Sequence, residues 1–221
     1  MNYKMNLFNE LTNIEKYLFM DVYIGHPNKL SICDKELCYE LCTENSFNLS
    51  FVPTRDDIIK RFTCANQIAI IVRNMKVTGF TLCKIIKNEN NVIINILATC
   101  VHNDVKNFRL STYLNFVINI YNNDSKRSYY QLFKNNLIFV TRTQLENIYT
   151  TFKSRFSIIE IDKRFLKDLL NIDNLNNFIE YELDKKMLVQ KNAYNKQVTN
   201  HIIEGIGDCD ALIMAGKCST F

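Results

Sequence analysis

The most constraining feature of this 221-residue sequence is a strand-forming run that leads through a polar turn into a helical pattern. Residues 92–101 read Val-Ile-Ile-Asn-Ile-Leu-Ala-Thr-Cys-Val, which is rich in strand formers and too short to span a membrane. Apolar residues then recur at helical spacing over 110–121. A helix that begins directly after a buried strand presents unpaired backbone N–H groups, which bind anions. Because Lys106 and Arg109 add positive charge there, the sequence predicts a phosphate-binding turn.

The whole chain reads as alternating helices and strands with an antiparallel start. We expect helices over residues 9–19, 35–43, 53–62, 106–121, 143–154, 164–171 and 175–188. We expect strands over residues 67–73, 77–87, 91–101, 129–133, 137–141, 157–161 and 211–214, with a hairpin turn at Asn74–Lys76. These elements predict an α/β (α+β) fold with a mixed, mostly antiparallel sheet flanked by helices. Since no repeat or low-complexity linker divides the chain, we expect residues 1–221 to form one domain.

Composition and charge narrow the function classes. With 47% hydrophobic and 23% charged residues, the chain can bury a sizeable core. The net charge of +4, without a block of lysines and arginines, favours a small anionic ligand over nucleic acid. No membrane span or secretory signal is apparent, so we expect a cytoplasmic protein. The abundance of Asn, Ile and Lys suggests an AT-rich genome, such as that of a large DNA virus or a parasite; if viral, the protein is expected in the host cytoplasm.

The eight cysteines raise the question of a metal site or disulfides. Cys33, Cys38 and Cys42, with His26 nearby, are the candidates, but their spacing has no paired C-x2-C of a zinc site. Apolar residues on the same segment instead indicate a helix whose cysteines lie partly in the core. We therefore expect free thiols and no metal.

The segment after residue 100 resembles a known superfamily. From Val101 to Leu114 the spacing matches, with no gap, the Val…Arg-x-x-Gly-x-Gly…Leu signature of the GNAT acetyltransferases, with Lys106, Arg109 and Ser111 at the three signature positions. Cys100-Val101-His102 followed by Lys-Asn-Phe-Arg-Leu-Ser is similar to the Cys-Val-His-Lys-Lys-Leu-Arg-Ser segment of the N-myristoyltransferase (glycylpeptide N-tetradecanoyltransferase) branch. Further stretches resemble that family in the same order, at residues 39–62, 76–80, 147–161, 205–209 and 217–218.

The resemblance implies a compact, single-module, GNAT-like enzyme that moves myristate from myristoyl-CoA to an N-terminal glycine amine by direct attack. It implies main-chain N–H groups of Ala98 and Thr99 as oxyanion donors, and the Phe221 carboxylate as the base. It also implies a CoA-phosphate cradle formed by Lys106, Asn107, Phe108, Arg109, Leu110 and Ser111. Its expected partners are myristoyl-CoA and proteins that begin with glycine. We expect a monomer without a tightly bound cofactor.

Two other functions stay open. An amine acetyltransferase would use acetyl-CoA and would lack a deep apolar slot. A catalytically inactive module would bind acyl-CoA or acylated peptides without turnover. The second alternative is suggested by Lys134, which falls on the family's active-site threonine, and by the short segment after Cys218.

Overall fold

The computed structural model describes residues 11–17, 20–45, 55–87, 91–108, 121–122, 127–128, 136–143, 146–160, 163–170, 178–180, 188–190, 207 and 211–218. The chain divides into two units, one of residues 1–85 and 97–128 and the other of residues 86–96 and 129–221. Strands β4 (Lys76–Lys87) and β5 (Val92–Val101) contribute to both units. The expectation of one domain therefore stays a prediction.

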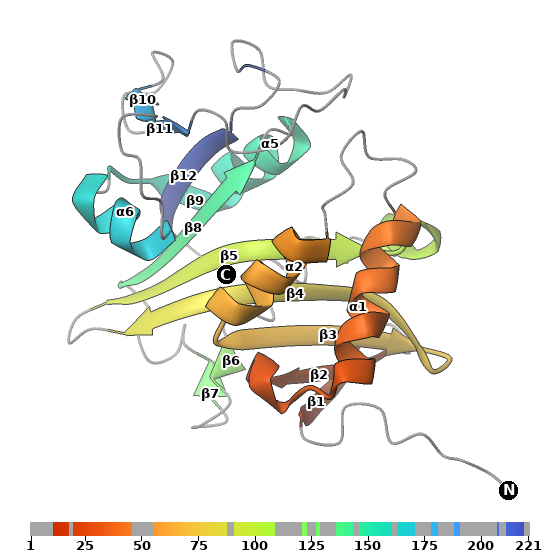
Figure 1. Cartoon of the computed structure of the whole chain (residues 1–221). Helices are drawn as coiled ribbons and strands as arrows, with labels where there is room; N and C mark the ends of the chain where they lie inside the picture. Colours follow the sequence, from red (N-terminus) through yellow and green to blue (C-terminus); the bar gives the residue numbers. More distant parts are fainter. Residues whose placement is uncertain are drawn as a thin grey trace, which may run out of the picture. The chain divides into compact units, whose positions relative to one another are not determined.

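The first unit contains β1 (Thr12–Tyr17), β2 (Met20–Gly25), β3 (Gln67–Arg73), most of β4 and the second half of β5 (Figure 1). These strands are hydrogen-bonded neighbours in chain order, and the β1–β2, β2–β3 and β3–β4 pairs are antiparallel. Asn74 and Met75 join β3 to β4 with positive φ angles of 50° and 63°. Such a two-residue loop matches the twist of a hairpin, and the predicted turn is confirmed.

Helices α1 (Ile32–Asn45) and α2 (Arg55–Cys64) lie on one face of this sheet (Figure 1). Helix α1 begins after Ser31, whose Oγ accepts the Asp34 N–H at 3.0 Å while Asp34 Oδ2 accepts the Ser31 N–H at 3.1 Å. This reciprocal capping satisfies two backbone donors that the helix itself cannot pair. Cys38 and Cys42 belong to α1 and are buried in the core that it covers, as the cysteine pattern predicts.

Both faces of β3 are buried. Ile68, Ile70 and Val72 pack in the cluster beneath α1 and α2, whereas Ala69 and Ile71 belong to a cluster on the opposite face. Because successive side chains of a strand point to opposite faces, a strand covered on both sides reads as one continuous apolar run. The Ile-Ala-Ile-Ile-Val sequence of β3 is such a run.

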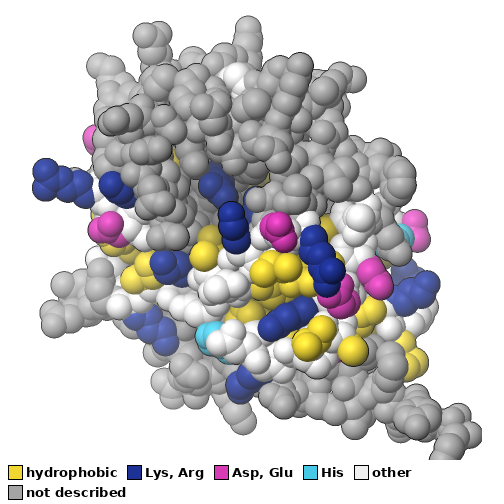
Figure 2. Space-filling model, viewed as in Figure 1, with side chains coloured by type: hydrophobic (Ala, Val, Ile, Leu, Met, Phe, Trp, Pro, Cys, Tyr) yellow, Lys and Arg dark blue, Asp and Glu magenta, His cyan; other side chains and the backbone are white. Residues whose placement is uncertain are grey.

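The surface drawn in Figure 2 carries positive and negative side chains interspersed around a small group of hydrophobic ones. Arg55 of α2 forms an ion pair with Glu36 of α1, and its guanidinium carbon lies 5.6 Å from the ring centre of Tyr39. Ile32 and Ile59 are exposed. Among the described side chains of this face, lysines and arginines alternate with acidic side chains.

The second unit has a mixed sheet. The first half of β5 runs parallel to β8 (Leu137–Thr143), which pairs antiparallel with β12 (Ala211–Cys218). The remaining strands are β9 (Phe156–Ile158), β10 (Phe178–Glu180) and β11 (Leu188–Gln190). The helices are α5 (Glu146–Arg155) and α6 (Lys163–Leu170), and α6 buries Leu166 and Leu169 against Ile93, Val140 and Ile213.

The predicted fold class is confirmed, because β5–β8 is the single parallel pair among the described registers and helices flank the sheet. Two element predictions are wrong. Residues 12–17 of the predicted first helix form β1, and the predicted helix at 175–188 contains β10 and the first residue of β11. The predicted helix from Lys106 to Tyr121 differs at its two ends, because residues 106–108 belong to the 3-10 helix η3 (Asn103–Phe108) and Tyr121 lies in β6 (Tyr121–Asn122), which pairs with β7 (Arg127–Ser128). Its residues 109–120 lie outside the described residues. The predicted strand at 129–133 lies outside the described residues.

Candidate active site

The pairing and the burial of strand β5 change halfway along its length. Its parallel pairing with β8 ends at Asn95 and Val140, although β5 continues to Val101 and β8 to Thr143. Residues 92–96 are buried, residues 97–100 are half-buried, and Val101 is buried again. A strand with neighbours on both sides is normally buried throughout. Residues Leu97–Cys100, called the open segment below, are therefore an accessible stretch within an otherwise buried strand.

The backbone of the open segment is held from two elements. Arg61 of α2 donates from Nη1 to the carbonyl oxygen of Leu97 at 2.5 Å. Thr81 of β4, which is fully buried, donates from Oγ1 to the carbonyl oxygen of Ala98 at 3.2 Å. The hydroxyls of Thr81 and Thr99 lie 3.0 Å apart. These contacts fix the carbonyl orientations of the open segment and hence the directions of its N–H groups.

Part of the open segment is covered by the first core. Leu97, Ala98 and Cys100 pack against the cluster beneath α1 and α2.

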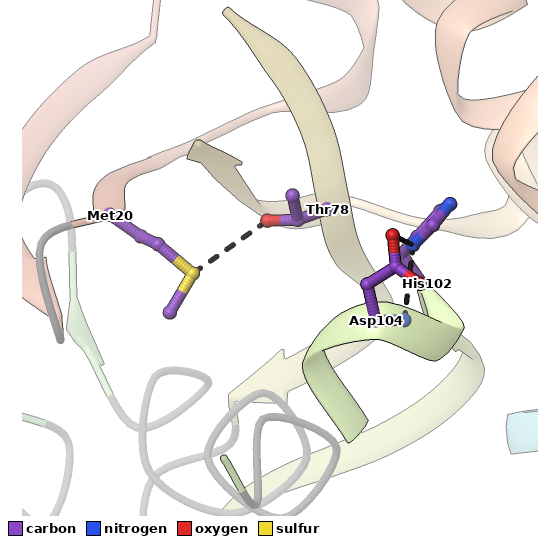
Figure 3. Close-up of polar contacts among 4 residues, drawn as sticks. All are labelled: Met20, Thr78, His102 and Asp104. Atoms are coloured by element: carbon purple, nitrogen blue, oxygen red, sulfur yellow. Dashed lines mark hydrogen bonds and ion pairs between the residues drawn. The ribbon is translucent and has the colours of Figure 1, made fainter. Parts of the chain in front are cut away.

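His102 connects the end of β5 to η3 (Figure 3). Its N–H donates to the carbonyl oxygen of Thr78 at 2.8 Å, and its own carbonyl accepts the N–H of Val105 at 3.1 Å. Thr78 is buried, and its Oγ1 donates to the carbonyl oxygen of Ile71 at 3.2 Å and lies 3.9 Å from the sulfur of Met20. The turn after β5 is thus anchored to the sheet through its backbone.

The imidazole of His102 caps η3. Nδ1 accepts the N–H of Asp104 at 3.2 Å and lies 3.5 Å from Asp104 Oδ2 (Figure 3). A ring nitrogen either accepts a hydrogen bond or donates one, so the two contacts exclude each other at a given moment. The shorter contact assigns Nδ1 as the acceptor. His102 has a structural role in this arrangement.

The predicted site residues fall into three groups. Ala98 and Thr99 lie in the open segment, and both are half-buried. Lys106, Asn107 and Phe108 form the second half of η3. Arg109, Leu110, Ser111, Lys134 and Phe221 lie outside the described residues. The structure therefore brings the predicted oxyanion donors and the first residues of the predicted phosphate cradle onto one strand and the turn that follows it.

Sequence reasoning missed Arg61, Thr81 and Asn95. Arg61 and Thr81 carry no local signal, because their partners are 36 and 17 residues away in the chain. Asn95 does have a local sequence signal, because it is the single polar residue among Val92–Leu97.

The thiol of Cys100, in the open segment, meets residues of α1. Cys100 Sγ donates to the carbonyl oxygen of Leu41 at 3.6 Å. A hydrogen bond with the Cys100 side chain, and then burial, raise the pKa of the Cys42 thiol far above its usual range. Burial, and then the neighbouring Cys100, raise the pKa of Cys38 in the same direction. Cys38 and Cys42 are therefore protonated core residues and poor nucleophiles.

Among the described residues, no three His, Cys, Asp or Glu side chains are placed to hold a metal ion. Within the same part of the chain, no helix has the length and apolar character needed to cross a membrane.

Comparisons with known proteins find similarity in structure alone. No protein-family model matches the sequence, and a search of curated proteins finds no match. Among solved structures, N-acetylglutamate synthase from Neisseria gonorrhoeae is similar at 10% identity over 93% of this chain and 36% of that chain, with a TM-score of 0.49. A GNAT-family acetyltransferase from Desulfovibrio desulfuricans has 11% identity over 89% of this chain and 98% of that chain, with a TM-score of 0.46. A ribosomal-protein alanine N-acetyltransferase from Escherichia coli has 13% identity over 90% and 96%, with a TM-score of 0.44. What these three enzymes act on is a property of those enzymes.

Proposed function

We propose that this chain is an acyl-CoA-dependent N-acyltransferase in which the open segment of β5 receives the thioester. The observation that carries the proposal is the half-exposure of residues 97–100 in a strand that is otherwise buried. A half-exposed stretch of a central strand can offer backbone N–H and C=O groups to an extended ligand. The amide-bearing arm of CoA is such a ligand.

The reaction needs donors at the thioester oxygen, which gains negative charge as the amine attacks. The N–H groups of Ala98 and Thr99 are assigned this role, because they lie in the half-exposed part of β5, where the carbonyls of Leu97 and Ala98 are held by Arg61 and Thr81. Donors fixed in advance need no reorganisation when charge develops. The attacking amine forms the new C–N bond, and CoA leaves as the thiol.

The phosphates are assigned to the turn that follows. Lys106 lies in η3, and Arg109 comes just after it in the sequence. Two cations at the end of a strand that presents CoA would bind its pyrophosphate. The support for this assignment is the matched spacing of the GNAT signature from Val101 to Leu114.

For the acyl donor we propose myristoyl-CoA, with an N-terminal glycine as acceptor. The support is the likeness of Cys100-Val101-His102 and the following basic segment to the N-myristoyltransferases. Acetyl-CoA is the competing donor.

The test is mass spectrometry of a peptide that begins with glycine, incubated with the protein and either myristoyl-CoA or acetyl-CoA. A mass gain of one acyl group supports the transferase, and the donor that gives it decides between the two proposals. No gain with either donor, while CoA still binds, would favour the inactive binding module. The double variant Lys106→Ala/Arg109→Ala should lose at least about tenfold in kcat/KM, mainly through KM for the donor.

A matched control comes from the other end of strand β4. Lys84 and Lys87 lie six and nine residues beyond Thr78, whose carbonyl binds the turn after β5. The double variant Lys84→Ala/Lys87→Ala removes the same net charge away from that turn. Equal losses of kcat/KM in the two double variants would show that the effect comes from overall charge and not from the turn after β5.

A further inference from the structure

Cys42 and Cys100 form a pair of thiols within the first unit. Cys42 belongs to α1 and Cys100 to the open segment of β5, and a hydrogen bond joins their side chains. Cys100 Sγ also lies 3.6 Å from the carbonyl oxygen of Leu41, which is 59 residues away in the chain. Cys42 is part of the cluster beneath α1 and α2, and Cys100 packs against that cluster. The fold therefore brings together two sulfur atoms that are far apart in sequence.

The two thiols differ in their access to solvent. Cys42 is buried, whereas Cys100 is half-buried and lies in the accessible stretch of β5. A small oxidant therefore meets Cys100 first. The guanidinium of Arg61 is close to the pair, because it donates to the carbonyl oxygen of Leu97 and its charge acts on Cys42. Partial exposure near a cation is the environment in which a cysteine reacts as its thiolate.

The hydrogen bond between the thiols gives them different roles. This bond, and then burial, raise the pKa of Cys42, so Cys42 stays protonated and donates to the sulfur of Cys100. A donor at that sulfur stabilises the thiolate of Cys100. Cys100 is thus the thiol that attacks an oxidant, and Cys42 is placed to attack Cys100 afterwards. Because the two sulfur atoms are already in contact, this second step proceeds although Cys42 is a poor nucleophile towards molecules in solution.

We propose that Cys42 and Cys100 are a peroxide-reactive site, which closes to a disulfide and inactivates the open segment. In the first step the Cys100 thiolate attacks one oxygen of hydrogen peroxide. The O–O bond breaks, Cys100 becomes a sulfenic acid, and the hydroxide that leaves takes up a proton to form water. In the second step the Cys42 sulfur attacks the Cys100 sulfur, the S–O bond breaks, and the hydroxyl leaves as water with the Cys42 proton. Two thiols are oxidised to one disulfide, and one peroxide is reduced to two waters.

The effect on the open segment follows from the position of Cys100. The disulfide replaces the hydrogen bond between the thiols and ties the Cys100 side chain covalently to α1. Cys100 comes directly after Thr99, whose N–H is assigned to the thioester oxygen. The link therefore alters the backbone that receives the acyl-CoA. This inactivation rests on the proposed function, whereas formation of the disulfide does not.

The first arm of the test maps the disulfide and needs no activity. The full chain is treated with hydrogen peroxide, alkylated and digested with trypsin. The peptides of residues 36–55 and 88–106, which carry Cys42 and Cys100, should appear by mass spectrometry as one disulfide-linked species. The first peptide also carries Cys38, so fragmentation of the linked species locates the bond. Absence of the linked species in the wild type, or a link through Cys38, overturns the assignment.

Variants provide the matched controls for this arm. The linked species should disappear in Cys100→Ala and persist in Cys33→Ala/Cys64→Ala, which removes two exposed thiols. Loss of the link in the exposed double variant would show that the disulfide forms by exchange through those thiols, and would overturn direct attack by Cys100.

The second arm measures binding of acetyl-CoA and myristoyl-CoA by calorimetry before oxidation, after oxidation and after reduction with dithiothreitol. Oxidation should weaken binding of the donor at least about tenfold, and reduction should restore it. In Cys100→Ala, peroxide should no longer change the affinity. A disulfide that forms without weakening the binding overturns the inactivation. A reduced protein that binds neither donor, while the disulfide still forms, overturns the proposed function and leaves the thiol pair standing.

Discussion

The guanidinium of Arg61 donates a hydrogen bond to the main-chain carbonyl of Leu97, joining α2 to the first residue of the open segment. This contact orients the peptide unit that precedes the predicted oxyanion donors. Arg61→Ala should therefore lower stability by about 2 kcal/mol and kcat by about tenfold. Urea denaturation and the peptide acylation assay measure the two effects. Lys60→Ala, an exposed change one residue away on the same helix, serves as control. If the two variants behave alike, the contact has no part in shaping the site.

Two histidines play the same capping role in different places. His102 Nδ1 accepts the Asp104 N–H before η3, and His26 Nδ1 accepts the Asn28 N–H at 3.1 Å before η1 (Pro27–Lys29). Replacing either with alanine should cost about 1 kcal/mol, because one backbone donor is left without its acceptor. Only His102→Ala should also weaken CoA binding, by about threefold or more, since only η3 leads into the proposed phosphate cradle.

The rescue variant for this prediction is His102→Asn. An Asn side-chain oxygen accepts from the N–H two residues on, as Nδ1 does here. It should restore both stability and CoA affinity, measured by urea denaturation and calorimetry. A loss of CoA affinity in His26→Ala equal to that in His102→Ala would show that the cap acts through general stability.

Gly216 is required for close packing in β12. A Cβ atom at this position would lie 2.6 Å from Phe156 Cβ and 2.9 Å from Phe152 Cε1, and both phenylalanines are buried. Gly216→Ala should destabilise the protein by about 1–3 kcal/mol, because neither the Phe156 Cβ nor the enclosed ring can move away. At Gly25 the added Cβ would meet the end of the Leu11 side chain, which can rotate. Gly25→Ala should therefore lower the free energy of unfolding by less than Gly216→Ala does. The urea denaturation midpoints of the two variants measure this order.

The buried thiols predict a loss of stability at alkaline pH. The pKa values of Cys38 and Cys42 are raised in the folded protein, whereas an unfolded cysteine has a pKa of about 8.5. Their contribution is therefore complete below about pH 8.5 and is lost as pH rises above it, because the unfolded chain releases protons that the folded chain retains. Urea midpoints should fall between pH 8 and 10.

The control for this prediction uses the exposed thiols. Cys38→Ala/Cys42→Ala should flatten the alkaline decline, whereas Cys33→Ala/Cys64→Ala should leave it unchanged. The buried double variant will be less stable at neutral pH, so the slope of the midpoint with pH is the quantity to compare. Equal slopes in all three proteins would assign the decline to other groups.

Local sequence patterns predicted the central strands and the covering helices well. The predicted strand at 67–73 matches β3, and the strands at 77–87 and 91–101 differ from β4 and β5 by one residue at one end. These runs are β-branched and buried on both faces, so propensity and tertiary burial agree. The helical spacing of the cysteines likewise predicted the buried side of α1.

The predictions from sequence are wrong where an element depends on a distant partner. Residues 12–17 have helical spacing, yet they form β1 because β2 offers a hydrogen-bonding edge. Residues 178–180 form β10 because β11 pairs with them. A strand gains its backbone hydrogen bonds only from a neighbour, and local propensity is too weak a preference to override that gain.

The sequence by itself determined the strand–turn unit around Val101, the buried strands before it and the free thiols of the first core, because each depends on residues close together in the chain. Only the tertiary structure decided that β5 leaves β8 after Asn95, that Arg61 and Thr81 hold the open segment, and that the Asn95 amide stays unpaired among the described residues. Those relationships join atoms far apart in sequence, and their energies exist only once the sheet has formed. The sequence determines which residues are available to the site, whereas tertiary packing determines the directions in which their groups point.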